Sequence, residues 1–144
     1  MMKVTIRKED YESILHYAKK ELPNEACGLI AGIDHEDERE IKMVYLLTNI
    51  DYSNEHFTID PKEHLASIKD MRANGLQPLG NWHSHPESPS RSSDEDIRLA
   101  VDKHASYLIL SLMDEDHPVL NAFHVEKGHS IKEQLEIKED SLWQ

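Results

Sequence analysis

Cysteine is almost absent from this sequence, whose 144 residues include a single one, Cys27. One cysteine cannot form a disulfide within the chain, so the sequence is compatible with a reducing compartment. The N-terminal segment lacks the apolar stretch and the small-residue cleavage site of a secretory leader. No window approaches the ~18 consecutive apolar residues of a membrane-spanning helix. We therefore expect a cytoplasmic protein without a membrane partner.

Positive charge is also scarce. Lys and Arg number 16 against 28 Asp and Glu, which gives a formal net charge of −12. A surface of this sign repels phosphate backbones, and no run of basic residues offsets it. This excludes nucleic acid as the expected partner. The acidity by itself names no substrate, because it is also what solubility requires.

Repeats, low-complexity tracts and long linkers are absent as well. The chain is close to the usual length of one domain, and a chain of this size buries roughly 68–70% of its unfolded surface. We predict a single domain over residues 1–144, in which 138–144 form a C-terminal tail. The sequence does not indicate an oligomeric state.

The hydrophobic pattern predicts three helices separated by groups of strands. The helices are expected over residues 8–22, 60–75 and 92–104; Asp60 is a candidate N-cap of the second, with Pro61 at its first position and Gly75 just after its last turn. Strands are expected over residues 4–6, 26–32, 39–49, 55–60, 77–85, 106–114, 118–126 and 130–137. Grouped strands with helices between the groups predict a mixed α/β fold, in which helices pack on a mixed sheet.

Two histidines at the end of the predicted strand 77–85 indicate a metal site. His83 and His85 are two residues apart and therefore face the same side of a strand. Imidazole suits zinc, but a catalytic zinc commonly has three protein ligands. After Pro86 and a short loop, Asp94, Glu95 and Asp96 occupy the first turn of the predicted helix. A carboxylate there can point back toward the histidines.

The same residues also have an explanation without metal. Ser93 and Asp96 have the spacing of a capping box, and acids favour the first turn of a helix because of its dipole. Glu25, just before the strand 26–32, is either an exposed strand-end residue or a carboxylate in a cleft that serves as a base. Spacing does not choose between these alternatives. Cys27 and Trp82 are expected in the core, with Trp82 on the strand face opposite the histidines.

The motif resembles the JAMM (MPN+) metallopeptidase signature, which is His-x-His-Pro, a spacer, then Ser-x-x-Asp, with a glutamate well upstream. The matching segments are 83–86 (HSHP), 93–96 (SDED) and 23–32 (PNEACGLIAG). The last of these is similar to the glutamate segment of the compact prokaryotic branch. The resemblance implies a cytidine-deaminase-like JAMM/MPN fold, a curved mixed sheet flanked by helices.

The resemblance also implies an enzyme, a zinc metallopeptidase with one Zn²⁺ per chain. His83, His85 and Asp96 would be the metal ligands, whereas Asp94 and Glu95 would be surface acids. Glu25 would act as general base and then as general acid toward the leaving amine. Ser93 would hydrogen-bond the carbonyl oxygen of the tetrahedral intermediate or help to hold the water. No covalent intermediate is implied, so Cys27 is not needed as a nucleophile.

The family's substrates imply hydrolysis of the amide bond after the C-terminal Gly-Gly of a ubiquitin-like protein. We favour a sulfur carrier of the ThiS or MoaD type, from which a cysteine or another C-terminal extension is released. The segment 55–60 is expected to bind the Gly-Gly tail by β-addition. Desampylase-like removal of a modifier from lysine is the alternative, and a non-catalytic MPN scaffold is a second. A DNA-repair role would call for a basic face, which the charge of −12 opposes.

Overall fold

The computed structural model describes residues 2–139, and this part of the chain contains seven strands and three helices. The helices are α1 (Lys8–Glu21), α2 (Pro61–Ala73) and α3 (Asp94–Leu99). The strands are β1 (Lys3–Arg7), β2 (Cys27–Asp34), β3 (Glu38–Leu47), β4 (Gln77–His85), β5 (Ser106–Ser111), β6 (Val119–Glu126) and β7 (His129–Lys138). None of the helices in the described range has the length and apolar character required to span a bilayer.

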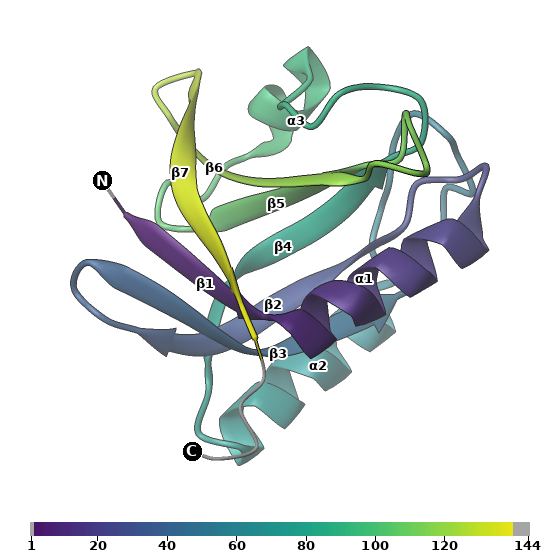
Figure 1. The fold of residues 1–144 in the computed structure, drawn as a ribbon. Coiled ribbons are helices and arrows are strands. Elements are labelled where there is room, and N and C mark those ends of the chain that lie inside the picture. The colour runs from purple at the N-terminus through teal and green to yellow at the C-terminus, as the bar shows by residue number, and fades with distance from the viewer. Residues whose placement is uncertain (1, 140–144) are drawn as a thin grey trace.

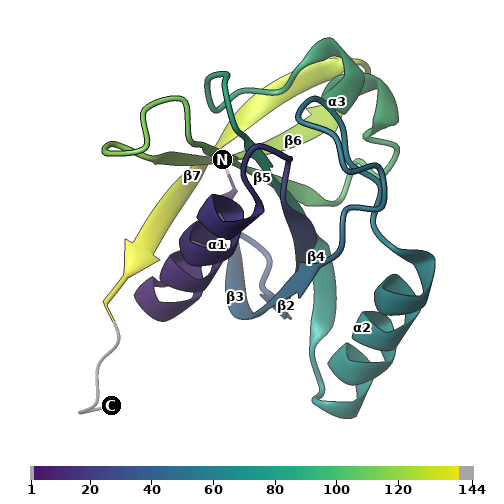
Figure 2. The same cartoon turned by 90° about the vertical axis from the view of Figure 1, so that its right-hand side faces the viewer.

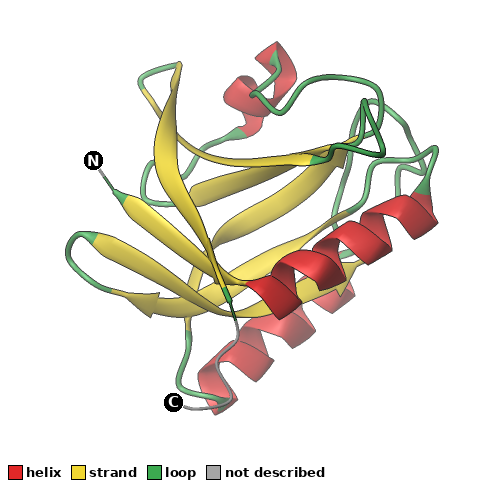
Figure 3. Cartoon of the chain, in the orientation of Figure 1, coloured by secondary structure: helices red, strands yellow, loops and turns green. Residues whose placement is uncertain are grey.

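The strands form one closed barrel in the order β1-β3-β2-β4-β5-β6-β7 (Figures 1 and 3). The pairs β1·β3, β1·β7 and β4·β5 are parallel, and the other pairs are antiparallel. The mixed α/β class is therefore confirmed. The curvature is strong enough that β1 pairs with β7 along its whole length, from Lys3 opposite Gln134 to Arg7 opposite Lys138. This pairing closes the sheet.

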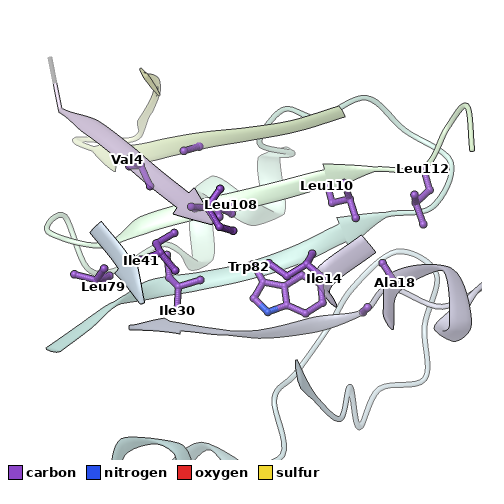
Figure 4. Close-up of a cluster of buried hydrophobic side chains, with 13 residues drawn as sticks. Val4, Ile14, Ala18, Ile30, Ile41, Leu79, Trp82, Leu108, Leu110 and Leu112 are labelled. Carbon is purple, nitrogen blue, oxygen red and sulfur yellow. The ribbon is translucent and has the colours of Figure 1, made fainter. Parts of the chain in front are cut away.

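Helix α1 contributes its apolar face to the barrel core. Figure 2 shows it lying along the strands, apart from α2. Ile14 and Ala18 of α1 are fully buried in one cluster with Trp82 of β4 and the inward side chains of the other strands. Figure 4 shows the Trp82 indole beside Ile14 between the strands. Trp82 is therefore a core residue, as the alternation along β4 predicts.

A glycine makes room for this indole. Trp82 donates a hydrogen bond of 3.0 Å from Nε1 to the carbonyl oxygen of Tyr45. A Cβ at Gly28 would collide with that same carbonyl oxygen and with Nε1 of Trp82. Only glycine at this position lets β2 lie between the indole and β3. The packing of Trp82 of β4 in the core thus depends on Gly28 of β2, in the segment that follows Glu25.

Helix α2 covers the other face of the β2–β3 sheet. Its Met71 is buried against Leu29, Ala31 and Leu47 in a second apolar cluster. The predicted N-cap is confirmed, since Asp60 accepts hydrogen bonds from the backbone of the first turn of α2. These contacts fix the connection between β3 and β4, which passes beside the candidate site.

Two predicted elements are wrong. Residues 55–60 are a loop with a single bridge between Asn49 and Ile59, because the alternating Phe57 and Ile59 pack into different neighbours instead of one sheet face. The third helix ends at Leu99, not at residue 104, because none of its residues is buried and no apolar face stabilises a further turn. Residues 140–144 of the predicted tail lie outside the described residues.

Candidate metal centre

The candidate centre begins at the C-terminal end of β4. His83 and His85 project from the same face of this strand, opposite Trp82 and Ser84, and they are 3% and 5% exposed. Their Nε2 atoms lie 3.1 Å apart. The strand therefore directs two imidazoles at one point, as the His-x-His spacing predicts.

Asp96 brings the third group to this point from the first turn of α3. Its Oδ2 lies 3.3 Å from Nε2 of His83 and 3.1 Å from Nε2 of His85. The capping box is also present: Ser93 N–H donates to Oδ2 of Asp96, and Asp96 N–H donates to the Ser93 hydroxyl. The two explanations of this helix start are therefore compatible, because one carboxylate takes part in both. Glu95 points elsewhere, and its Oε2 lies 3.3 Å from Nδ1 of His56.

The tautomer of His85 makes this arrangement suitable for a cation. Nδ1 of His85 lies 2.9 Å from the carbonyl oxygen of Pro89, a contact that requires an N–H on Nδ1. A neutral His85 then directs the Nε2 lone pair at the Asp96 oxygen and at His83. The His83 Nε2, which can carry a hydrogen in the neutral ring, completes the cluster, and the three atoms converge on one point where a metal ion could take the place of that hydrogen. The donor set of two imidazole nitrogens and one carboxylate oxygen suits zinc.

The pKa values of the three groups reflect the same geometry. Burial lowers the pKa of His83, which keeps that imidazole neutral. Burial also opposes charge on His85 and Asp96, but the hydrogen bonds between them outweigh it. The pKa of His85 is therefore raised, and that of Asp96 is held far below its usual range. A negative carboxylate beside neutral or protonated imidazoles results.

The ring of His83 is held differently from that of His85. Its Nδ1 is buried and has no hydrogen-bond partner among the described residues. Instead the Phe57 ring stacks on it, with centroids 4.7 Å apart and 25° between the planes. No sequence pattern predicts this contact, because Phe57 lies in a loop far from His83 along the chain.

Glu25 lies in the short segment between α1 and β2 and is 5% exposed. Its backbone is fixed by hydrogen bonds to the loop that follows β3, from its N–H to the Ser53 oxygen and from Asn49 Nδ2 to its carbonyl. Burial raises the pKa of the Glu25 carboxyl to about 8, although His85 acts in the opposite sense. The carboxyl is therefore a cleft residue, not an exposed strand end.

Ser84 connects Glu25 to the histidine strand. The Ser84 hydroxyl accepts a 2.8 Å hydrogen bond from Ala26 N–H, and Ser84 N–H donates to the Ala26 carbonyl oxygen at 3.0 Å. The residue between the two histidines thus positions the segment that carries the glutamate. The spacing motif by itself did not reveal this role.

Two cavities adjoin the cluster. One lies next to His83 and is lined by apolar side chains, among them Phe57, Leu99 and Ile109, and by the carboxyl groups of Glu95 and Asp96. The other lies next to His85, and its lining residues are Glu25, Asn54, Glu55, His85, Glu87, Ser88 and Ser93. All five residues expected in the site line these cavities: His83 and Asp96 line the first, and Glu25, His85 and Ser93 line the second. The fold therefore brings all five to one region.

The other histidine, cysteine and acidic side chains do not add to the metal centre. Within residues 2–139, His83, His85 and Asp96 form the only group of three or more His, Cys, Asp or Glu side chains whose ligand atoms lie close enough to hold a metal ion. Cys27 is buried, and burial raises the pKa of its thiol to about 12. It is therefore a small core residue, as predicted.

Comparison with known proteins places this geometry in a family context. Residues 7–125 match the family described as prokaryotic homologs of the JAB domain. The CysO-cysteine peptidase of Mycobacterium tuberculosis is 28% identical over 138 residues, which cover 94% of this chain and 92% of that protein. The desampylase of Haloferax volcanii is 30% identical over 105 residues, which cover 69% of this chain and 74% of that protein.

Solved structures show the same fold. A protein from Desulfitobacterium hafniense has a TM-score of 0.87 and 46% identity, covering 99% of this chain and 96% of that one. A JAB1/MPN domain protein from Archaeoglobus fulgidus has a TM-score of 0.56 and 22% identity, covering 93% of this chain and 98% of that one. Because the identity to the Archaeoglobus fulgidus protein is only 22%, that similarity concerns the fold alone.

Proposed function

The chain belongs to the family of prokaryotic homologs of the JAB domain, and from this premise we propose that it is a zinc-dependent peptidase. The bond it would hydrolyse is the amide after the C-terminal Gly-Gly of a ubiquitin-like protein of the sulfur-carrier type. One observation carries the proposal: the potential ligand atoms of His83, His85 and Asp96 converge on one point, and the buried Glu25 lines a cavity beside it. The names of the relatives, CysO-cysteine peptidase and desampylase, support the substrate class.

His83, His85 and Asp96 would hold one zinc ion. When bound, zinc supplies a Lewis acid that lowers the pKa of water from 15.7 to about 7 and polarises a carbonyl group. Its fit rests on the convergence of Nε2 of His83, Nε2 of His85 and Oδ2 of Asp96 on one point. Asp96 is also fixed in place by the helix start.

Glu25 would move the protons of the reaction. Its carboxylate takes a proton from the attacking water and passes it to the departing nitrogen, a role that suits a buried group next to a cavity. The water oxygen then joins the carbonyl carbon, the carbon–nitrogen bond breaks, and the nitrogen leaves as an amine. General acid–base catalysis of this kind contributes about 10²–10⁴-fold.

Ser93 would stabilise the carbonyl oxygen as charge develops on it. Its hydroxyl oxygen accepts from Asp96 N–H, which leaves the hydroxyl proton free to be donated. Ser93 lines the same cavity as Glu25, so donor and base face a common space. A donor aimed at a developing oxyanion is typically worth about 3–4 kcal/mol.

The metal site is tested by metal analysis of the protein purified without added zinc. We expect about one zinc per chain, as in other sites with three protein ligands, and its loss in His83→Ala. His16→Ala on the exposed face of α1 is the matched control and should keep the metal. Zinc content in His83→Ala equal to that of the wild type would exclude this site.

The role of Glu25 is tested separately with Glu25→Gln. This variant should retain zinc, because the glutamate is not one of the converging ligands. It should lose about 10²–10⁴-fold of the hydrolysis of a carrier protein extended beyond Gly-Gly. If it hydrolyses this substrate at the wild-type rate, Glu25 is not the base.

A further inference from the structure

The cavity next to His83 lies on the outer face of β4 and β5. Asn81 and His83 of β4 are paired with Tyr107 and Ile109 of β5, and all four residues line the cavity. Most of the other lining residues come from the loop after β3 and from α3. The space of about 60 Å³ exceeds the roughly 10–15 Å³ that one water molecule needs. The cavity can therefore hold ordered water beside the ligand cluster.

Two polar atoms on this face lack a protein partner. Within residues 2–139, Nδ1 of His83 and Oδ1 of Asn81 are both buried and form no hydrogen bond. The two residues are two apart on a regularly paired stretch of β4, so their side chains are neighbours on one face. Buried polar groups in native proteins are almost always bonded to protein or to ordered water. A partner for both atoms is therefore expected in the cavity that both residues line.

The two atoms have complementary chemistry. Nε2 of His83 faces Oδ2 of Asp96 and Nε2 of His85, so a zinc ion bound there leaves the hydrogen of the neutral ring on Nδ1. Nδ1 is then a donor, whereas the amide oxygen of Asn81 is an acceptor. One water molecule accepts from the first and donates to the second. Two hydrogen bonds of about 2.8 Å through this water join atoms up to about 5.6 Å apart.

The carboxyl groups that line the same cavity do not take the place of this water. Oδ2 of Asp96 faces Nε2 of His83, and Oε2 of Glu95 lies 3.3 Å from Nδ1 of His56. In His85 the Pro89 carbonyl oxygen accepts from Nδ1, at 2.9 Å. Of the two histidine ligands, only His83 thus lacks an acceptor for its outer nitrogen among the described residues.

The stacked ring of Phe57 fixes the plane of the His83 imidazole but not its direction. A half-turn about the Cβ–Cγ bond leaves the plane unchanged and so preserves the stack, yet it moves Nε2 away from the ligand cluster. The terminal torsion of histidine is broad and roughly two-fold, so stacking alone does not distinguish the two orientations. A hydrogen bond from Nδ1–H forms in only one of them, the one that presents Nε2 to the metal.

We propose that Asn81 is a positioning residue for the metal ligand His83, and that it acts through one ordered water. This water accepts a hydrogen bond from His83 Nδ1–H and donates one to Asn81 Oδ1. It gives His83 the outer hydrogen bond that the Pro89 carbonyl gives His85. The inference rests on the proposed zinc site and adds to it a residue that is not itself a ligand.

The test is zinc affinity, measured by competition with a chelator. Asn81→Leu is nearly isosteric but lacks the acceptor, and it should lower zinc affinity about 10–100-fold, as the loss of groups that orient metal ligands typically does. Asn81→Asp keeps an acceptor oxygen and should bind zinc at least as tightly as the wild type. Asn74→Ala, at the exposed C-terminal end of α2, is the matched control and should leave the affinity unchanged.

A second measurement depends on no variant. A crystal structure of the zinc-loaded wild type should show an ordered water within hydrogen-bond distance of both Nδ1 of His83 and Oδ1 of Asn81. The lack of a water at that point, or a hydrogen bond from Nδ1 to a different group, would overturn the inference.

The outcomes separate this inference from the proposed function. Wild-type zinc affinity in Asn81→Leu would overturn the role of Asn81 while the zinc site stands. An affinity in Asn81→Asp as low as in Asn81→Leu would overturn it too, because the acceptor would then not be what matters. If the wild-type protein binds no zinc, the proposed metal site fails and this inference fails with it.

Discussion

At the scale of single residues, Asp96 and His85 are each held in position by contacts outside the ligand cluster. One oxygen of Asp96 accepts a hydrogen bond from Ser93 N–H and lies against both imidazoles. The Pro89 carbonyl fixes the proton of His85 on Nδ1 when that ring is neutral. His83 has no such partner, and the stacked ring of Phe57 takes its place in holding the imidazole.

Phe57→Ala should therefore weaken zinc binding. Without the stacked ring, His83 is free to leave its orientation, and groups that orient metal ligands typically contribute 10–100-fold to affinity. We expect zinc affinity, measured by competition with a chelator, to fall about tenfold. Phe57→Tyr keeps the ring and should bind zinc as the wild type does. Unchanged affinity in Phe57→Ala would show that the stack does not position His83.

At the scale of elements, the site is assembled where β4 ends and α3 begins. Strand β4 supplies the two histidines and α3 supplies Asp96, and their connection runs past Pro89. The loop after β3 contributes Phe57 and fixes the backbone of Glu25. In Figure 2 this loop passes beside α3, where His56 reaches Glu95. The site is therefore formed by the end of β4, the start of α3 and the loop after β3.

Ser84→Ala should destabilise this assembly. The variant leaves the buried N–H of Ala26 without its acceptor, which costs about 1–3 kcal/mol. The free energy of unfolding, measured by urea denaturation, should fall by that amount. Ser13→Ala, on the exposed face of α1, is the matched control and should change it by less than about 0.5 kcal/mol. A change in Ser84→Ala as small as that of the control would contradict the link between β4 and the Glu25 segment.

At the scale of the whole molecule, barrel closure separates two polar regions. In the β4–β5 register His85 lies opposite Ser111, and Gly80 lies opposite Ser106 near the other end of the pair. At that end Arg39 donates a 2.6 Å hydrogen bond to the Ser106 hydroxyl, and both residues are buried. Glu133 of β7 is buried there too, and its Oε1 has no partner in the described part of the chain.

Glu133 predicts a pH dependence of stability. Burial raises its pKa above the usual 4.5, although Ser106, Arg39 and His124 oppose the shift. The folded state thus binds this proton more tightly than the unfolded state, so its stabilising contribution is complete below pH 4.5 and is lost as the pH rises through the folded pKa. The glutamine in Glu133→Gln does not ionise, so this variant does not lose stability as the pH rises through the pKa of Glu133. Relative to the wild type, its free energy of unfolding should rise as the pH increases above 4.5 and through the raised pKa of Glu133.

The matched control for this prediction is Glu136→Gln on the same strand. A hydrogen bond and an ion pair with Lys3 lower the pKa of Glu136, so its contribution is present above its usual pKa and lost in acid. The Glu136→Gln difference should therefore shift in the opposite sense or, because both side chains are exposed, change little. A pH-independent difference for Glu133→Gln would contradict the burial effect.

Local patterns predicted most elements and part of the site. The His-x-His spacing on a strand, the Ser93–Asp96 capping box and the Asp60 cap of α2 are short-range features, and the structure has them where the sequence places them. The same short-range reasoning was wrong for residues 55–60 and for the end of the third helix. In both cases apolar residues that fit a periodic pattern contact different partners or none.

The sequence by itself determined the family, which the match over residues 7–125 confirms, and it pointed to the segments that carry the candidate ligands. It did not determine that β1 pairs with β7, that Phe57 covers His83, or that Glu25 and Ser93 line one cavity. The physical reason is the distance along the chain over which each interaction acts. Periodicity, caps and spacing act over a few residues, whereas the hydrogen bond that ties the Glu25 segment to the histidine strand joins residues 58 apart. Only the packed barrel brings such segments together.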